Sequence, residues 1–431
     1  MQKEVPTTEQ KPSYVMNSKP EKKGSVLRVF TIFFHPNNSV TAVGGAEKRF
    51  VEILKILDNQ TDLEITVLES APSLLVRSVS TCKKYSLASG FQGKGWLSTY
   101  FEWILWAVKA SIRSLSIARH AKPNVILVPN NTLPNLISGY ASSQVLRLPL
   151  CVVTHHVDVP CFETKNSRSM SLYGCYRSIS YGKLVSLAKT LAFYVTLLIL
   201  KKAKGIVTVS NFTANALRNN GVSQSRIVVS SNAVDPCLVE NAEARKNKRI
   251  YDGIFVGRIS KEKGIFDLLS VWKEVSKAKK GAKLLIVGSG LELPKIKQKI
   301  SALNLENRVF LRGSCTDNEL ASLLNSSRIF VFPSLFEGWG IAVAEALAYG
   351  LSVVAYDIPA LREVFGDCRS VFLVPVKNFD SMTSTILDIM AASEEEHERL
   401  NRCARDYSER FTWEKAALKD LELLKTFKTA N

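Results

Sequence analysis

Two glutamates stand eight residues apart in the segment FEGWGIAVAEALAYG, where the other residues are small or apolar. An ionised carboxylate is costly to bury without a partner. Glu337 and Glu345 must therefore pair with residues elsewhere in the chain or face a cleft that holds a ligand. A loop is predicted before a short helix from Ile341 to Tyr349, which stops at Gly350. The two carboxylates need not form a catalytic pair on this pattern, and they can hold two parts of one ligand.

A basic loop and a glycine pair could bind phosphate groups. In VGRISKEKG, a forked donor, Arg258, and a point charge, Lys263, follow a predicted strand, which suits a diphosphate. Gly44 and Gly45 precede a predicted helix, and the free N–H groups at a helix N-terminus can face a phosphate. Taken singly, a glycine pair is more often a turn, and a lysine-rich loop is more often solvated.

A fourth motif, THHVD, follows another predicted strand, so His155, His156 or Asp158 could touch a reacting centre. A histidine in that position is more often structural. All these motifs nevertheless follow strands, and open α/β sheets bind ligands beyond the carboxyl ends of their strands. The eight cysteines are scattered without a CxxC pair, and no metal-binding spacing lies near the motifs, so we expect no metal and a reducing, cytosolic compartment.

Short apolar runs that alternate with helical patterns predict two tandem α/β domains with parallel sheets. The predicted strands of the first half are Val26–Phe34, Leu63–Ser70, Asn124–Asn130, Leu150–His156 and Gly205–Ser210. Those of the second half are Tyr251–Ile259, Ala282–Gly290, Asn307–Gly313, Arg328–Ser334, Leu351–Asp357 and Ser370–Pro375. The predicted boundaries are a disordered basic tail at residues 1–24, an N-terminal domain at 25–236, a C-terminal domain at 237–408 and a final helix at 409–431.

The chain is strongly basic, and its charge is uneven. The net charge is +18, and residues 1–240 carry 28 Lys+Arg against 14 Asp+Glu. Residues 164–220 include nine basic residues and no acidic one. This asymmetry indicates an anionic partner, which could be a membrane surface, a phosphorylated substrate or nucleic acid. A soluble basic surface without such a partner is the alternative.

Two apolar segments bear on membrane contact. Trp96–Lys122 combines three tryptophans with four cations, which is typical of a helix in a membrane interface, although a core helix fits it equally well. Thr190–Leu200 has 11 uncharged residues, where a span needs about 20, so no segment is expected to cross a membrane. The tryptophan segment and the basic region together favour peripheral contact with an anionic membrane, on its cytoplasmic face.

Several motifs together resemble the retaining glycosyltransferases of family 4. They are VGRISKEKG, LLIVGSG, FPS, EGWGIAVAEALAYG, SVVAYDIPALREV, GGAEKRFVEIL and FTWEKAALKDLELL. The resemblance covers about Val26 to Phe427 and is densest in the second half, where two glutamates separated by seven residues are its most specific feature. It implies the GT-B fold, in which two Rossmann-like domains face each other across a cleft and the last helix returns to the first domain. It also implies that a hexose moves from a nucleotide-diphosphate sugar to an acceptor hydroxyl with retention of anomeric configuration, without a cofactor.

The resemblance assigns roles in the second domain. Arg258 and Lys263 match the pair that binds the donor diphosphate. Glu337 matches the contact to the donor sugar, and Glu345 matches the contact to the ribose hydroxyls. The loop amides around sugar and phosphate would come from Gly338, Trp339 and Gly340. Because the ligand would bring the hydroxyl partners, both carboxylates are expected to be hydrated in the empty site.

The resemblance also assigns roles in the first domain. Gly44 and Gly45 match the loop that faces the phosphate. His156 matches the active-site histidine, although the neighbouring His155 leaves the register open. Ala233 stands where the interdomain loop often carries glycine, and the long basic loop between residues 160 and 181 has no family motif. That loop is expected to contact the acceptor, which we take to be lipid-linked or a membrane-associated glycan.

Other classes of function are less consistent with the sequence. A sugar-nucleotide isomerase (epimerase) of the same fold would not need the apolar and basic segments of the first half. A basic accessory or nucleic-acid-binding protein would explain the charge, but not the combination of Arg258, Lys263, Glu337 and Glu345. We therefore expect no nucleic acid as partner. No G-x-G-x-x-G follows the first strand, which argues against a dinucleotide-dependent oxidoreductase.

Overall fold

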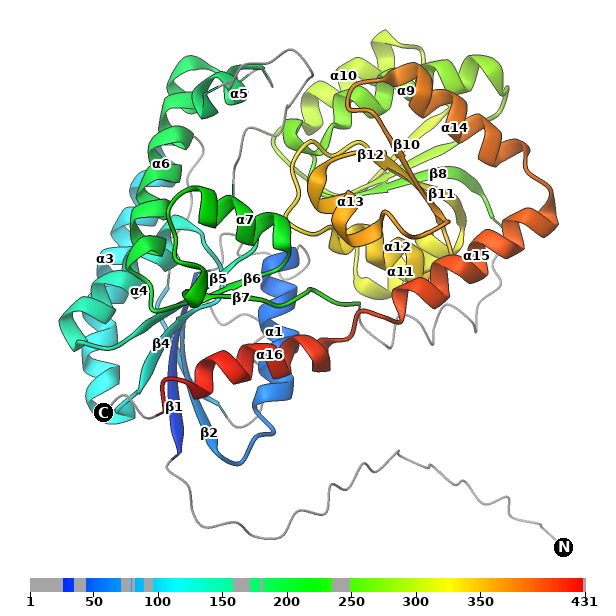
Figure 1. The fold of residues 1–431 in the computed structure, drawn as a ribbon. Helices are drawn as coiled ribbons and strands as arrows, with labels where there is room; N and C mark the ends of the chain where they lie inside the picture. Colours follow the sequence, from blue (N-terminus) through cyan, green and yellow to red (C-terminus); the bar gives the residue numbers. More distant parts are fainter. Residues whose placement is uncertain are drawn as a thin grey trace, which may run out of the picture.

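The structure is a computed structural model of the 431-residue chain. It describes residues 26–34, 44–70, 79, 82–88, 96–157, 171–178, 181–234 and 249–428. The predicted tail at residues 1–24 lies outside the described residues. Two parallel sheets, each covered by helices on both faces, form two neighbouring domains (Figure 1). This arrangement confirms the predicted GT-B fold.

The first domain contains a seven-stranded sheet in the order β3-β2-β1-β4-β5-β6-β7, and all neighbouring strands are parallel. Its central strands are apolar throughout because both faces are covered, and every residue of LCVVT is buried. The strands are β1 (Leu27–Phe33), β2 (Leu63–Glu69), β3 (Lys83–Ser86), β4 (Val125–Val128), β5 (Leu150–Thr154), β6 (Gly205–Thr208) and β7 (Ile227–Val229).

Alternate residues of each strand face opposite helical layers. Phe30 and Ile32 of β1 pack in the layer that contains α3, α4, α6 and α7, whereas Val29 packs in the layer that contains α1 and α16. The helices of this domain are α1 (Gly45–Leu57), α3 (Trp96–Ala121), α4 (Leu133–Leu146), α5 (Leu172–Ser178), α6 (Lys183–Lys202), α7 (Asn211–Asn219) and the short 3-10 helix η1 (Gln224–Arg226).

The second domain contains a six-stranded parallel sheet in the order β10-β9-β8-β11-β12-β13. Its strands are β8 (Tyr251–Val256), β9 (Leu284–Val287), β10 (Val309–Gly313), β11 (Ser327–Phe332), β12 (Ser352–Tyr356) and β13 (Val371–Val374). Its helices are η2 (Lys261–Lys263), α9 (Ile265–Ala278), α10 (Leu293–Ala302), α11 (Asp317–Asn325), α12 (Ile341–Ala348), α13 (Pro359–Phe365), α14 (Phe379–Ala391) and α15 (Glu394–Ser408).

Each sheet has one topological switch point, from which the strand order runs in opposite directions toward the two edges. It lies between β1 and β4 in the first sheet and between β8 and β11 in the second. Open α/β sheets bind ligands beyond the carboxyl ends of the strands at such points. The glycine pair follows β1, the basic loop follows β8 and the glutamate segment follows β11, so three predicted motifs lie at the two switch points.

Three elements differ from the predictions. The edge strands β3 and β7 were not predicted, because KKYS has no apolar run and IVV has three residues. The helix that contains Thr190–Leu200 is α6, which has 20 residues. By length and composition α6 could cross a membrane, and it is the one helix among the described residues that meets this criterion. The predicted length of 11 residues was therefore too short, because it stopped at the flanking lysines.

The last helix, α16 (Trp413–Lys425), returns to the first domain and packs beside α1 (Figure 1). A buried ion pair joins the two helices, since both guanidinium NH groups of Arg49 lie 2.8 Å from the carboxylate oxygens of Asp420. Arg49 also donates to Ser230 Oγ at 3.0 Å, at the end of β7. The pair therefore fastens the carboxyl end of the chain to the first sheet.

Replacing Asp420 with alanine should lower the free energy of unfolding of the first domain by about 3–5 kcal/mol, because the buried Arg49 charge would lose its partner. Urea unfolding monitored by circular dichroism measures this change. The matched control is Glu396→Ala, which removes an exposed pair with Arg399 and should leave the free energy nearly unchanged. Equal effects of the two substitutions would show that α16 does not depend on the buried pair.

Candidate functional site

The two domains meet where the loop after β5 faces the loop after β11. Gly338 lies so close to the first domain that a Cβ atom there would be 1.6 Å from the carbonyl oxygen of His155 and 3.3 Å from the Cα of His156. No side chain can be accommodated at that distance, which explains why glycine occupies position 338. The predicted histidine motif and the predicted glutamate segment are thus brought into direct contact.

Two helix N-termini approach each other at the same place. Gly45 begins α1 and Ile341 begins α12, and a Cβ atom at Gly45 would lie 2.9 Å from Ile341 Cδ1. Gly340 caps α12 with a φ of 108°, a left-handed conformation that favours glycine. The free N–H groups and the positive ends of two helix dipoles therefore point toward one region, which favours an anion there.

Each glutamate of the opening segment pairs with a lysine. Glu337 Oε1 lies 2.5 Å from Lys263 Nζ, within the second domain. Glu345 Oε1 lies 2.6 Å from Lys48 Nζ, which comes from α1 of the first domain. All four side chains are at least four-fifths buried. The expectation that the empty site leaves the carboxylates hydrated was therefore wrong, since ion pairing replaces the water that burial removes.

Lys48 is the main residue of the site that the sequence analysis missed. It lies in the first turn of α1, three residues after Gly45, and within the quoted motif GGAEKRFVEIL. Its position in that motif was the available signal. Its partner is 297 residues away in the sequence, so only the fold brings the two groups together.

Backbone contacts hold the loop after β8 against the loop after β11. Gly264 has a φ of 67°, and a Cβ atom there would lie 1.8 Å from the carbonyl oxygen of Pro333. The backbone N–H of Leu335 donates to the carbonyl of Glu262 at 2.8 Å. These contacts hold Lys263 beside Glu337. Arg258 stands at the start of the same loop with an exposed side chain, and no described residue forms an ion pair with it.

The side chain of Trp339 is buried in an aromatic cluster. It is buried edge-on against Phe365 and Phe411, with ring centroids 5.3 and 4.9 Å apart. The indole therefore anchors the loop in the core of the second domain. Only the backbone of Trp339 can take the predicted part in ligand binding.

The structure distinguishes the two neighbouring histidines. The ring of His156 lies edge-on to Phe336 of the second domain, with centroids 6.2 Å apart. The ring of His155 instead contacts the carbonyl of Pro129 at 3.1 Å, within the first domain. Burial, assisted by the charge of Arg49, lowers the pKa of His155 to about 3, so this ring is neutral. His156 is thus the histidine that faces the second domain. Asp158 lies outside the described residues.

Two further contacts connect the domains around this region. Glu363 of α13 accepts hydrogen bonds from the backbone N–H groups of Asn211 and Phe212, at 2.7 and 2.6 Å, and so caps α7. Glu262 of η2 lies 3.4 Å from Lys189 of α6. Although burial raises the pKa of Glu262, the charge of Lys189 and a hydrogen bond from Tyr181 outweigh it and lower the pKa below the usual value.

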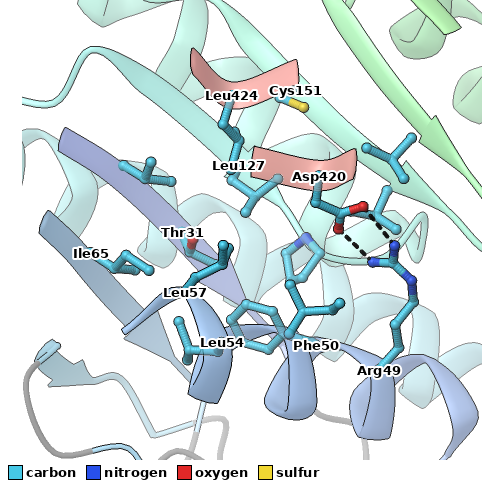
Figure 2. A pocket seen from close by; sticks show the side chains of 15 residues that line it. Thr31, Arg49, Phe50, Leu54, Leu57, Ile65, Leu127, Cys151, Asp420 and Leu424 are labelled. Atoms are coloured by element: carbon cyan, nitrogen blue, oxygen red, sulfur yellow. Dashed lines mark hydrogen bonds and ion pairs between the residues drawn. The ribbon is translucent and has the colours of Figure 1, made fainter. Parts of the chain in front are cut away.

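A separate cavity lies inside the first domain, between its sheet, α1 and α16 (Figure 2). Its lining is mainly apolar, and the Arg49–Asp420 pair stands at its edge. The cavity has room for about one or two water molecules. None of the predicted site residues lines it, so this cavity is not the functional site. Among the described residues, no group of three His, Cys, Asp or Glu side chains could hold a metal ion.

Two family models match adjacent parts of the chain. The model described as Glycosyltransferase Family 4 matches residues 43–237, and the model described as Glycosyl transferases group 1 matches residues 240–407. Together they match all but two residues of the range 43–407. These matches, with the fold, place the chain in a glycosyltransferase family of the GT-B fold.

The curated relatives support the same family. An uncharacterized glycosyltransferase from Methanocaldococcus jannaschii is 28% identical over 49% of this chain and 57% of its own length. The poly(glycerol-phosphate) alpha-glucosyltransferase of Bacillus subtilis is 29% identical over 42% of this chain and 26% of its own length. The chain thus spans between about a quarter and somewhat more than half of these relatives.

A solved structure has the same fold over almost the whole chain. HepE of Anabaena, in complex with UDP and glucose, has a TM-score of 0.66 and 17% sequence identity, covering 92% of this chain and 99% of that protein. At this identity the likeness concerns the fold alone.

Replacing Gly338 with alanine should separate the two domains, because the new methyl group cannot fit against the carbonyl of His155. Small-angle X-ray scattering should then give a larger radius of gyration than for the unchanged chain. The matched control is Gly182→Ala, since a Cβ atom at Gly182 would meet nothing within 4 Å. An unchanged scattering curve for Gly338→Ala would contradict the closed arrangement described above.

Proposed function

We propose that the chain transfers a hexose from a nucleotide-diphosphate sugar to an acceptor hydroxyl, with retention of anomeric configuration. The observations that carry this proposal are the two lysine–glutamate pairs and the two helix N-termini that meet beside them. The cations and helix N-termini can bind a diphosphate, and the carboxylates can accept hydrogen bonds from hydroxyl groups. A nucleotide-diphosphate sugar offers both kinds of group in one molecule.

The donor would exchange partners with the residues of the empty site. Its diphosphate binds Arg258 and Lys263, and Lys263 then leaves Glu337. The freed carboxylate of Glu337 accepts hydrogen bonds from hydroxyls of the donor sugar. The Lys263–Glu337 pair is thus replaced by two contacts, from Lys263 to the diphosphate and from the sugar hydroxyls to Glu337. Both buried charges keep a partner when the donor is bound.

The nucleoside would lie against α12. Glu345 accepts hydrogen bonds from the ribose hydroxyls, and Lys48 remains close enough to compensate its charge. The backbone N–H groups of Gly44, Gly45, Gly338, Trp339 and Gly340 surround the phosphates and the sugar. Because Lys48 belongs to the first domain, the donor would be held by both domains at once.

Catalysis would be mainly electrostatic. When the bond between sugar and diphosphate breaks, negative charge develops on the departing diphosphate. Arg258, Lys263 and the two helix N-termini stabilise that charge, and no bound divalent cation is required. His156 lies near the donor sugar, and no residue is assigned as a protein nucleophile. Contact between the domains excludes water, which limits hydrolysis of the donor.

The names of the relatives support the choice of donor and stereochemistry. The Bacillus subtilis relative is named as an alpha-glucosyltransferase, and the Anabaena structure contains UDP and glucose. These proteins favour UDP-glucose as the first donor to test and an α-linked product. We keep GDP-hexoses in the same screen because the residues that pair with the base are not identified.

The acceptor is proposed to be lipid-linked or part of a membrane-associated glycan. The excess of basic residues in the first domain favours an anionic surface as partner, and the loop expected to contact the acceptor belongs to that domain. The protein would then work as a peripheral enzyme on the cytoplasmic face of a membrane.

The test is incubation of the chain with UDP- or GDP-hexoses and a lipid-phosphate acceptor, in the presence of EDTA. We expect transfer of the sugar, with the anomeric configuration of the product determined by NMR. Arg258→Ala should lower kcat/KM by about 100-fold or more, because the departing diphosphate loses a forked donor. Arg312→Ala, which removes an exposed pair with Glu319, is the matched control and should leave the rate unchanged. Full activity of Arg258→Ala, or activity lost with EDTA, would contradict the proposed roles.

A further inference from the structure

The helix α6 has an apolar face that no described part of the chain covers. Leu184, Leu187, Leu191, Tyr194 and Leu198 are all at least half exposed, and Leu184 is 81% exposed. Their spacing places them along one side of the helix. By contrast, the residues that α6 buries in the core of the first domain lie near its carboxyl end, at Leu197, Ile199 and Leu200. The amino-terminal part of α6 extends beyond the sheet toward α5 (Figure 1).

A second exposed apolar face lies on α3. Phe101, Ile104, Val108 and Ile112 are exposed at helical spacing, and Phe101 and Ile112 are more than 65% exposed. The inner side of the same helix packs through Trp106 and Ala110 into the cluster that also holds the end of α6. Both helices therefore cover the same face of the first sheet, and both leave large apolar side chains in solvent.

Cations border both apolar faces. Lys183 stands at the start of α6 and Lys201 and Lys202 at its end, while Lys109 and Arg113 lie on the exposed side of α3. Residues 171–178 and 181–234, which contain α5, α6 and α7, include no acidic residue. An apolar stripe bordered by lysine and arginine is the pattern of a helix that lies in the interface of an anionic bilayer.

The inner side of α6 contacts the loop after β8, which carries Lys263. Lys189 Nζ lies 3.4 Å from a carboxylate oxygen of Glu262 and 5.0 Å from the ring centroid of Tyr181. Lys261 Nζ lies 5.6 Å from the same centroid. Lys263, which we assign to the donor diphosphate, is the next residue after Glu262. One helix thus carries an uncovered apolar face on its outer side and a contact to the proposed donor site on its inner side.

We infer that the outer face of α6, with that of α3 on the same side of the first sheet, docks the protein on an anionic lipid bilayer and so presents the donor site to acceptors held in that bilayer. This inference deepens the proposed function, on which its account of the acceptor rests. Docking would bury the leucines of α6 among the acyl chains and place the bordering lysines at the phosphate groups.

The contacts of α6 favour docking in the plane of the bilayer over insertion across it. A spanning position would remove Leu197, Ile199 and Leu200 from the core and would separate Lys189 from Glu262. A second copy of the chain is a less suitable occupant, because a two-fold contact through this face would bring its lysines close to one another.

The first experiment measures co-sedimentation of the full chain with vesicles of phosphatidylcholine, with and without phosphatidylglycerol. We expect binding to the vesicles that contain phosphatidylglycerol and weaker binding at high salt. Leu187→Glu/Leu191→Glu should lower the bound fraction by about tenfold or more. Leu187→Ser/Leu191→Ser should also lower it, which separates lost apolar contact from added charge. Thermal unfolding shows that each variant is folded.

The matched control is Leu418→Glu, because Leu418 is also exposed but lies on α16, away from the proposed surface. It should bind vesicles like the unchanged chain. If no vesicle binds the unchanged chain at low salt, or if the α6 variants bind equally well, the inference is wrong. Sedimentation equilibrium that shows dimers, lost in the α6 variants, would assign the face to a second copy instead.

A second experiment separates this inference from the proposed function. Vesicle binding is measured without donor or acceptor, so it can succeed even if no sugar is transferred. If transfer occurs, the α6 variants should keep the rate toward a water-soluble acceptor and lose at least about tenfold toward an acceptor embedded in vesicles. Equal losses toward both acceptors would contradict a role for α6 in docking.

Discussion

The structure depends on how two buried carboxylates are compensated between its domains. Glu337 and Glu345 lie where water is largely excluded, so each needs a cation. Lys263 reaches Glu337 only because the loops after β8 and β11 are stitched at Gly264. Lys48 reaches Glu345 only because α1 of the first domain meets α12 of the second. The pair that neutralises Glu345 is therefore also a contact between the domains.

This arrangement connects ligand binding with closure. A donor that brings phosphates and hydroxyls can bind Lys263 and both carboxylates, so filling the site would break the Lys263–Glu337 pair and leave Lys48 near Glu345. The glycine contact at Gly338 lets the backbones approach without an intervening side chain. Glu363, which caps α7 from the other domain, adds a contact at the rim. The close contact between the domains, which brings Lys48 to Glu345, also excludes water from the proposed reaction.

Much of this could be predicted from the sequence, because apolar strands and their following loops are local signals. The central strands and the motifs at Arg258, Glu337 and Glu345 were recognised in this way. The edge strands β3 and β7 were missed, since they are short and their sequences lack a distinctive pattern. Lys48 was missed, and the carboxylates were wrongly expected to be hydrated, because Lys48 and Glu345 are 297 positions apart and Lys263 and Glu337 are 74 apart. The spacing of residues in the sequence does not predict such long-range contacts.

The central claim is that the donor binds between the domains by taking Lys263 from Glu337, while Glu345 binds the ribose with Lys48 still close to it. A crystal structure of the full chain with an unhydrolysed nucleotide-diphosphate hexose tests it most directly. We predict the diphosphate on Arg258 and Lys263, the sugar hydroxyls on Glu337 and the ribose on Glu345, with Lys263 moved away from Glu337. A donor bound elsewhere, or bound with the Lys263–Glu337 pair intact, would contradict this account.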